Sequence, residues 1–151
     1  MKILNKLQPQ ENIQIIGEIT ALMMKSPIHE KFLIKDIKDF VVPPISCNQF
    51  RIYKNSKDMP VGYVSWALVS DELEHKMLHE KYCLKHNEWQ TGKNLVFIDF
   101  IAPFGHAKKI IKDLRTKIFP NKTGCYLRFD DIGKCRKIVF IHGIKSKETK
   151  K

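Results

Sequence analysis

Acidic residues are scarce in this sequence relative to basic ones, and the imbalance is large for a chain of this size. The 151 residues include 16 Asp and Glu against 27 Lys and Arg, which gives a formal net charge of +11. A surplus of this size indicates an anionic partner, and three classes fit: nucleic acid, a membrane surface or an acidic protein.

Long hydrophobic runs and closely spaced cysteine pairs are absent from the sequence. No apolar run approaches the roughly 18 residues that a membrane-spanning helix needs, and the polar N-terminal stretch does not fit a secretory signal. The four cysteines are scattered, with no C-x-x-C pair: Cys47, Cys83, Cys125 and Cys135. We therefore expect a cytoplasmic protein with reduced thiols and without stable membrane insertion.

The length and composition are those of one globular domain with a sizeable core. We place that domain at residues 1–144 and a basic C-terminal tail at residues 145–151, where the sequence becomes polar and lysine-rich. Hydrophobic periodicity predicts alternating helices and strands, hence an α/β (α+β) domain whose mixed sheet is flanked by helices on both faces. The expected helices are 12–25, 70–84 and 106–119; the expected strands are 48–54, 61–69, 95–101, 126–129 and 138–142; and 40–45 is expected to be an extended connector.

The strand that begins at Leu95 is the most informative element of the sequence. It is apolar and rich in aromatic and β-branched residues, which is typical of a strand buried on both faces, yet it contains Asp99. Simple alternation places Leu95, Phe97, Asp99 and Ile101 on one face. A buried carboxylate needs a partner, so Asp99 either caps a turn, pairs with a structural Lys or Arg, or orients a catalytic group.

The segment after this strand combines a turn with a basic helix. Pro103 ends the strand, and Gly105 permits an unusual backbone angle or the close approach of another molecule. The backbone N–H groups that open the next helix can receive an anion, and Lys108 and Lys109 follow directly. One glycine alone makes this a weak phosphate motif.

Two patterns leave other functions open. His75, His79 and Cys83 recur at intervals of four on one predicted helix, with His86 following, and this spacing can place metal ligands on one face. No paired cysteines support that site, and a solvated helix face explains the spacing equally, so we predict no metal. The net charge also fits a nucleic-acid-binding module without catalysis, although no groove-reading motif is present.

Several stretches together resemble the bacterial lysine acyltransferases that activate RTX haemolysins and leukotoxins. They are Ser26-Pro27-Ile28-His29, Pro44-Ile45, Asn48-Gln49-Phe50, Pro60-Val61, Ser65-Trp66-Ala67, Phe97 to Gly105, Phe119-Pro120, Gly133-Lys134 and His142-Gly143. The likeness extends from about Ile16 to Gly143, and its most specific part is the run from Asp99 to Gly105 with the upstream Ser-Pro-x-His. Phe97 and Phe100 depart from the family, because tryptophans are common at both positions.

The resemblance implies an acetyltransferase-superfamily fold and a specific reaction. Such a protein moves a fatty acyl group from acyl-acyl carrier protein, whose phosphopantetheine arm holds the thioester, to internal lysines of an RTX protoxin. No bound cofactor and no nucleic acid are then expected, and a homodimer is compatible with the resemblance. The family's essential histidine and aspartate map onto His29 and Asp99.

The chemistry of these residue types agrees with that assignment. A lysine amine has an unperturbed pKa near 10.4, so a general base that removes its proton is useful, and histidine titrates near neutral pH. Asp99 can hold the other ring nitrogen of His29, although His29 can also be a capping or core histidine. We expect Ser26 to cap the turn, and Gly105 to belong to a turn near backbone donors for the oxyanion.

Three further expectations concern substrates. Lys108, Lys109, Lys112 and Arg115 are expected to dock the acidic carrier protein, unless they form an ordinary solvated helix face. An apolar slot for the acyl chain is expected from the central strand and Trp66. Cys47 is a candidate for a covalent acyl intermediate, but direct attack by lysine in a ternary complex is preferred, because nothing near Cys47 in sequence activates it.

Overall fold

The computed structural model describes residues 9–130, 132 and 134–146. Its secondary structure begins with the long helix α1 (Pro9–Met23), passes through a series of short helical segments, and then alternates strands with helices. Residues 147–151 of the expected basic tail lie outside the described residues. The boundary between domain and tail at residue 144 stays a prediction.

A five-stranded mixed sheet forms the centre of the molecule, in the order β1-β2-β3-β4-β5. The strands are β1 (Phe50–Lys54), β2 (Pro60–Val69), β3 (Asn94–Ile101), β4 (Thr123–Phe129) and β5 (Cys135–His142). All neighbours are antiparallel except β3 and β4, which are parallel. The mixed sheet confirms the expected fold class, and the last two strands begin three residues earlier than the sequence pattern indicated.

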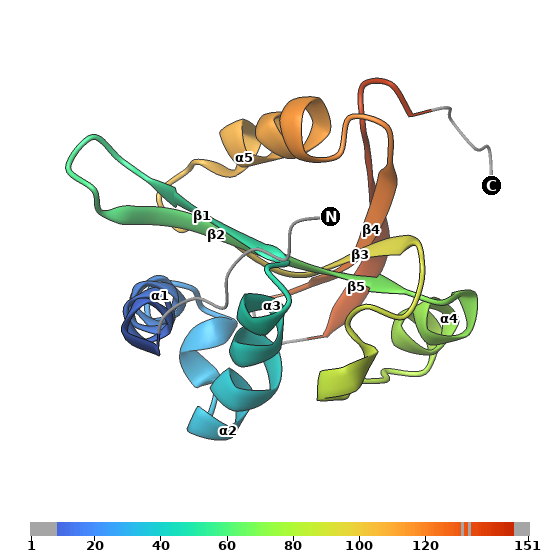
Figure 1. Ribbon diagram of the computed structural model, residues 1–151, viewed down its shortest axis with the longest axis horizontal. Coiled ribbons are helices and arrows are strands. Elements are labelled where there is room, and N and C mark those ends of the chain that lie inside the picture. The colour runs from blue at the N-terminus through green and yellow to red at the C-terminus, as the bar shows by residue number, and fades with distance from the viewer. Residues whose placement is uncertain (1–8, 131, 133, 147–151) are drawn as a thin grey trace.

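Helices cover both faces of this sheet. Helix α5 (Ala107–Asp113), continued by the π-helical turn η4 (Leu114–Ile118), lies on one face, and α1 lies on the other together with the short segments that follow it and α4 (Asp71–His79) (Figure 1). Buried side chains from β2 and β3 pack against both layers, so the core lies on both sides of the sheet. The crossover through α5 joins β3 to its parallel neighbour β4, because parallel strands need such a connection.

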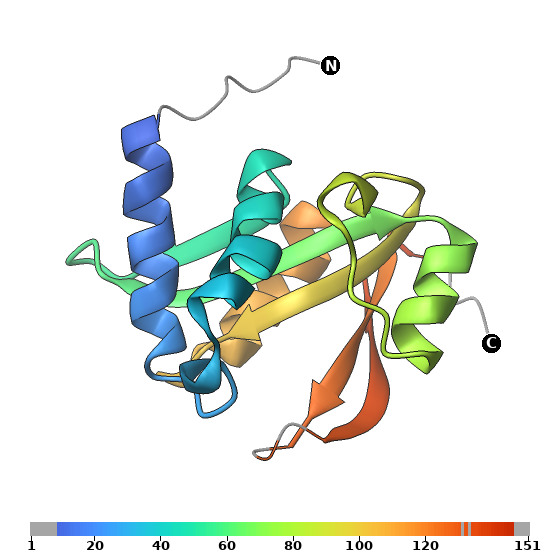
Figure 2. The same cartoon turned by 90° about the horizontal axis from the view of Figure 1, so that it is seen from below.

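The expected extended connector at 40–45 is instead helical. The 3-10 turn η1 (His29–Lys31), α2 (Ile34–Asp36), the π-helical turn η2 (Ile37–Val41) and α3 (Val42–Ser46) follow one another along one face of the sheet (Figure 2). Pro43 and Pro44 are tolerated because they lie in the first turn of α3, where a backbone N–H has no helical acceptor. Both prolines are buried, so the pair packs into the core.

Helix α4 begins as predicted and ends sooner. The Ser70 hydroxyl accepts a hydrogen bond from the Leu73 N–H at 3.3 Å and so caps the N-terminus of the helix. The helix ends at His79, five residues before the expected end, and Lys81 then adopts a left-handed backbone with a φ of 54°. The chain continues irregularly to the 3-10 turn η3 (His86–Glu88).

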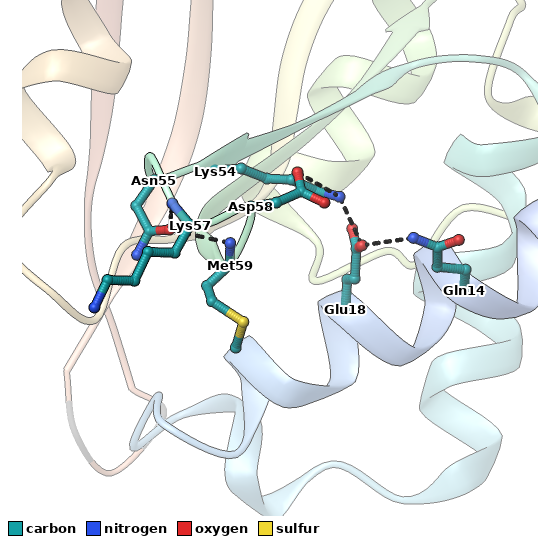
Figure 3. Close-up of polar contacts among 7 residues, drawn as sticks. All are labelled: Gln14, Glu18, Lys54, Asn55, Lys57, Asp58 and Met59. Atoms are coloured by element: carbon teal, nitrogen blue, oxygen red, sulfur yellow. Dashed lines mark hydrogen bonds and ion pairs between the residues drawn. The ribbon is translucent and has the colours of Figure 1, made fainter.

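The turn between β1 and β2 is fastened to α1 by one lysine. Lys54 Nζ lies 2.7 Å from Glu18 Oε1 of α1 and 3.6 Å from Asp58 Oδ1 of the turn (Figure 3). Asn55 stabilises the turn itself, because its side-chain oxygen accepts hydrogen bonds from the N–H groups of Lys57 and Met59. The segment that joins the two strands is thus a defined turn tied to α1.

Candidate active site

An irregularity in β3 decides where Asp99 points. Trp66 of β2 pairs with Phe97, and Val64 pairs with Phe100, so the single residue Ser65 faces two residues of β3. This is a β-bulge, in which the strand with the extra residue changes the faces of its later side chains. The expectation that residues 95, 97, 99 and 101 share one face is therefore wrong.

The bulge divides β3 into two parts with different neighbours. Before it, Leu95 and Phe97 pack in the core cluster that contains Ile110 and Leu114 from the α5 side. After it, Ile101 packs in the cluster that contains residues of α1. Asp99 thereby faces the α1 layer, and its N–H donates to the buried Ser65 hydroxyl at 3.3 Å.

His29 meets Asp99 from that layer, although 70 residues separate the two in sequence. The histidine stands at the start of η1, two residues after Pro27, in a turn where the Glu30 N–H donates to the Ser26 carbonyl at 2.9 Å. His29 Nε2 lies 3.0 Å from Asp99 Oδ1, and both side chains are 9% exposed. The structure thus brings together the two residues that the sequence singled out.

The Ser26 hydroxyl contacts the other nitrogen of the His29 ring. Its Oγ lies 2.7 Å from His29 Nδ1. The expectation that the Ser26 side chain caps the turn is therefore wrong; no side-chain cap is present at η1, and the hydroxyl turns to the histidine instead. Ser26, His29 and Asp99 form a continuous line of hydrogen bonds that ends at a buried carboxylate.

The direction of each hydrogen bond follows from the donors available. An ionised carboxylate only accepts, so Nε2 of neutral His29 carries the proton, and Nδ1 accepts from the Ser26 hydroxyl. Asp99 consequently fixes the tautomer in which Nδ1 is the basic nitrogen. A hydroxyl donating to that nitrogen is the arrangement in which a serine can relay a proton or act as a nucleophile.

A buried tyrosine adjoins the carboxylate and was not anticipated from the sequence. Tyr63 of β2 is 0% exposed, and its hydroxyl makes no hydrogen bond within the described part of the chain. Burial raises the pKa of Tyr63, the charge of Asp99 raises it further, and the neighbouring Ser65 hydroxyl offsets part of the rise. Tyr63 therefore stays neutral beside Asp99. The sequence signal that could have identified Tyr63 is its position on β2, two residues before Ser65.

The backbone around the end of β3 contains the expected turn and a free edge. Gly105 has a φ of 82°, a left-handed conformation that favours glycine. Pairing between β3 and β4 is limited to Leu95 with Gly124 and Val96 with Cys125. Past Val96, β3 has no ladder partner on that side among the described residues, which leaves its backbone edge open near Asp99.

The four basic residues of the helix lie on the opposite side of the sheet from His29. They belong to α5 and η4, which lie on the other face of the sheet from the layer formed by α1 to α4 (Figure 1), and all four are exposed: Lys108, Lys109, Lys112 and Arg115. No described carboxylate lies within ion-pair distance of the three lysines, whereas Arg115 Nε donates to the His142 carbonyl at 2.7 Å. A surface hollow of about 340 Å³ lies among Lys108, Lys112 and Arg115.

Two other expected groups are placed differently. Val96, Phe97 and Ile98 of the central strand line an apolar cavity, but Trp66 does not, because it is buried against the edge of the Phe119 ring at a centroid distance of 5.1 Å. Burial raises the pKa of Cys47 above that of an ordinary thiol, so its nucleophilic thiolate is disfavoured at neutral pH.

The possible metal ligands form no closed set. His75 and His79 are ring neighbours on α4, with centroids 4.8 Å apart, and His75 Nδ1 lies 3.6 Å from Glu80. In the described ranges, no group of three or more His, Cys, Asp or Glu side chains is arranged to hold a metal ion. Over the same residues, no helix combines the length and hydrophobicity needed to cross a bilayer.

Comparison of the sequence with known proteins identifies the family of this chain. A protein of unassigned function from Synechocystis sp. strain PCC 6803 is 41% identical over 123 residues, 81% of this chain and 84% of that protein. The RTX-I toxin-activating lysine-acyltransferase ApxIC of Actinobacillus pleuropneumoniae is 33% identical, covering 87% of this chain and 76% of ApxIC. The protein-lysine myristoyltransferase HlyC of Escherichia coli is 34% identical, covering 88% of this chain and 77% of HlyC. The family model described as HlyC, RTX toxin acyltransferase family, matches residues 8–142, and the chain therefore belongs to the RTX toxin acyltransferase family.

Proposed function

We propose that this protein transfers a fatty acyl group from acyl-acyl carrier protein to the side-chain amine of internal lysines in an RTX protoxin. The observation that carries the proposal is the hydrogen-bonded line from the half-buried Ser26 through His29 to the buried Asp99, with contacts of 2.7 and 3.0 Å. Family membership supports the acyltransferase class, and the names of relatives point to lysine as acceptor. Carrier protein as donor and protoxin as target are our inferences.

In this mechanism, His29 is the general base. The attacking lysine passes its proton toward Nδ1, either directly or through the Ser26 hydroxyl, and Asp99 stabilises the imidazolium that forms. The amine nitrogen bonds to the thioester carbonyl carbon, the carbon–sulfur bond then breaks, and the carrier's thiolate takes up the proton. Backbone N–H groups on the open edge of β3 and in the loop to Gly105 are the proposed donors to the oxyanion.

The test combines the full-length protein, an acyl-loaded carrier protein and a lysine-bearing toxin fragment, followed by mass spectrometry. Wild type should add one acyl mass per modified lysine, and His29→Ala and Asp99→Ala should lose the activity while keeping the wild-type circular dichroism spectrum. His75→Ala, which removes an exposed histidine of α4, should retain activity. Absence of acylation by wild type with several acyl donors would contradict the proposal.

The Ser26 hydroxyl also makes a covalent route possible, in which the acyl group first forms an ester with the serine. The short contact to His29 Nδ1 is the observation that favours this second route. Incubation with the acyl donor alone distinguishes the two, because an acyl-serine would add one acyl mass to the enzyme. We expect no such adduct, and Ser26→Ala should slow transfer rather than abolish it.

The exposed lysines of α5 are proposed to bind the acidic carrier protein. Helix α5 begins just after the loop that follows β3, so its first turn lies near the end of the strand that holds Asp99. Charge reversal by Lys108→Glu with Lys112→Glu should raise KM for the carrier-borne donor at least tenfold at low salt, because charge steers the encounter. Lys57→Glu, on the β1–β2 turn, is the matched control and should leave KM unchanged. An unchanged KM in the double variant would remove α5 as the docking surface.

A further inference from the structure

The two most exposed large apolar side chains among the described residues lie far apart in the sequence. Ile34, at the start of α2, is 86% exposed, and Ile132, in the loop between β4 and β5, is 81% exposed. A single apolar side chain in water is ordinary, whereas several that gather on one face indicate an interaction site. The surroundings of both residues therefore decide what they mean.

The chain from the end of α1 to α2 presents three such side chains. Phe32 packs against the core cluster that contains residues of α1, whereas Leu33 and Ile34 are 67% and 86% exposed, and Met24 is 63% exposed. The backbone here forms a defined turn, because the Leu33 N–H donates to the Asp36 carboxylate at 2.8 Å. Leu33 and Ile34 are thus directed outward by an ordered segment.

The loop between β4 and β5 is ordered around one aspartate. Asp130 Oδ1 accepts hydrogen bonds from the N–H groups of Ile132 at 3.1 Å and Lys134 at 2.8 Å, and the Asp130 N–H donates to the Lys134 carbonyl at 3.0 Å. Phe129, the last residue of β4, is half-exposed. The hairpin therefore ends in a fixed loop with Ile132 in water.

These segments share one edge of the molecule. The C-terminal end of α1, the segment with α2 and the end of the β4–β5 hairpin all lie along the lower edge in Figure 2. Residues 24–36 and 128–137 together contain seven basic and four acidic residues, and Asp36 and Asp130 accept the backbone hydrogen bonds just described. We call this edge the apolar–basic face; its members are Met24, Leu33, Ile34 and Ile132, with the exposed cations Lys25, Lys31, Arg128 and Lys134.

We propose that the apolar–basic face binds reversibly to the surface of an anionic bilayer, with Ile34 and Ile132 inserted below the headgroups and the basic side chains among them. Apolar side chains combined with lysine and arginine are what interfacial membrane binding requires. A bilayer suits this face better than a protein partner does, because the isoleucines stand on two separate projections, a helical turn and a hairpin end, and fluid lipid adapts to both. The inference goes beyond the proposed function and does not depend on it.

The proposed catalytic histidine belongs to the segment that meets the bilayer. His29 lies between Met24 and Leu33 in the chain and is itself buried. Docking of this face therefore brings the reaction to the membrane surface without requiring that His29 contact lipid.

Co-sedimentation with vesicles tests the binding without any donor or acceptor. The full-length protein is mixed with vesicles of phosphatidylcholine alone, or of phosphatidylcholine and phosphatidylglycerol in about equal amounts. We expect binding to the anionic vesicles that weakens as ionic strength rises, and little binding to the neutral ones. Absence of binding to the anionic vesicles at low salt, or equal binding to both kinds, would overturn the proposal.

Two serine substitutions separate insertion from simple attraction by charge. Ile34→Ser with Ile132→Ser should weaken binding about a hundredfold, or about tenfold for each side chain, because burial of an isoleucine in hydrocarbon is worth at least that factor. Ile13→Ser is the matched control and should change nothing: Ile13 is 70% exposed but lies in the first half of α1, toward the opposite edge in Figure 2. Unchanged binding of the double variant would show that charge alone attracts the protein, and the role of this face would be refuted.

A fluorescent probe provides a second measurement on a chain with a single surface change. Cys135 is exposed at the start of β5, beside the hairpin loop. A polarity-sensitive dye on Cys135, in the Cys83→Ser variant, should shift its emission to shorter wavelength with anionic vesicles. The same dye attached through Lys57→Cys on the β1–β2 turn, with both exposed cysteines replaced by serine, should not shift.

Equal shifts at the two positions would contradict the proposed orientation. Capture of soluble polyglutamate by wild type, without binding to vesicles, would identify an acidic protein as the partner and likewise overturn the proposal. Because no donor or acceptor is present in these measurements, failure of the proposed transfer reaction leaves their outcome unaffected.

Discussion

Replacement of Asp99 by asparagine tests the site most directly, because it removes a charge with little change of shape. In the wild-type structure His29 Nε2 lies 3.0 Å from Asp99 Oδ1. An asparagine oxygen at this position can still accept the hydrogen bond from His29 Nε2. What is lost is the attraction between carboxylate and imidazolium. For charges about 4 Å apart at an effective dielectric constant of about 20, that attraction is about 4 kcal/mol.

This energy converts directly into an expected rate. Both side chains are 9% exposed, so solvent screens the pair only weakly. A loss of about 4 kcal/mol in the transition state corresponds to about a thousandfold in kcat/KM, with the substrate KM little changed if Asp99 acts only through His29. The assay is the initial rate of peptide acylation, measured by mass spectrometry from about pH 6 to pH 9.

Asp113 provides a matched control on the other side of the sheet. It also bears a partly buried carboxylate, which accepts a hydrogen bond from the Tyr53 hydroxyl at 2.9 Å and lies 3.3 Å from Arg51 Nε. Asp113→Asn should lower the unfolding midpoint without changing kcat/KM. If Asp99→Asn kept more than a tenth of wild-type activity, the charge of Asp99 would not stabilise the transition state, and the reasoning would fail.

Four further substitutions test the surroundings of the site. Ser65→Ala leaves the buried Asp99 N–H unpaired, so it should lower the free energy of unfolding by about 1–3 kcal/mol, measured by urea unfolding. It should also reduce kcat more than fivefold; full activity would mean that the bulge holds without Ser65. Tyr63 has a raised pKa when folded, so its contribution is present below about pH 10, the unfolded value, and falls as pH rises further; Tyr63→Phe should therefore lessen the alkaline loss of stability. Cys47→Ala should keep full activity, and Cys47 should react with iodoacetamide more slowly than the exposed Cys83, because burial raises the Cys47 pKa. Gly105→Ala should cost about 1–2 kcal/mol through its left-handed backbone, seen as a fall in Tm of roughly 2–8 °C.

The sequence predicted the main elements and singled out Asp99 because these depend on local signals, whereas His29 was assigned through the resemblance to the family. A carboxylate in an apolar strand is conspicuous, since its burial is costly without a partner, and Ser26-Pro27 marks the end of a helix. The mixed sheet followed from the alternation of hydrophobic patterns. None of these inferences required knowledge of how distant segments pack.

The features that could not be predicted depend on such packing. The bulge at Ile98–Asp99 is set by pairing with β2, and no residue of β3 announces it. The helical path through Pro43 and Pro44 is stabilised by burial against the sheet, which overrides the usual extended preference of consecutive prolines. The Ser26 hydroxyl contacts His29, only three residues along the chain, and the distant Asp99 holds the other nitrogen of that ring.

The extra residue in β3 also decides which side chains of the strand face each helical layer, and therefore which substitutions each position tolerates. From Leu95 to Phe97 the odd-numbered side chains meet the α5 layer, whereas after the bulge Phe100 packs on that layer and the odd-numbered Asp99 and Ile101 face away from it. Simple alternation over the same residues, without the bulge, would place Asp99 on the face of Leu95 and Phe97, beneath α5. The proposed reactive centre therefore depends on the number of residues in β3, as well as on which residues are present.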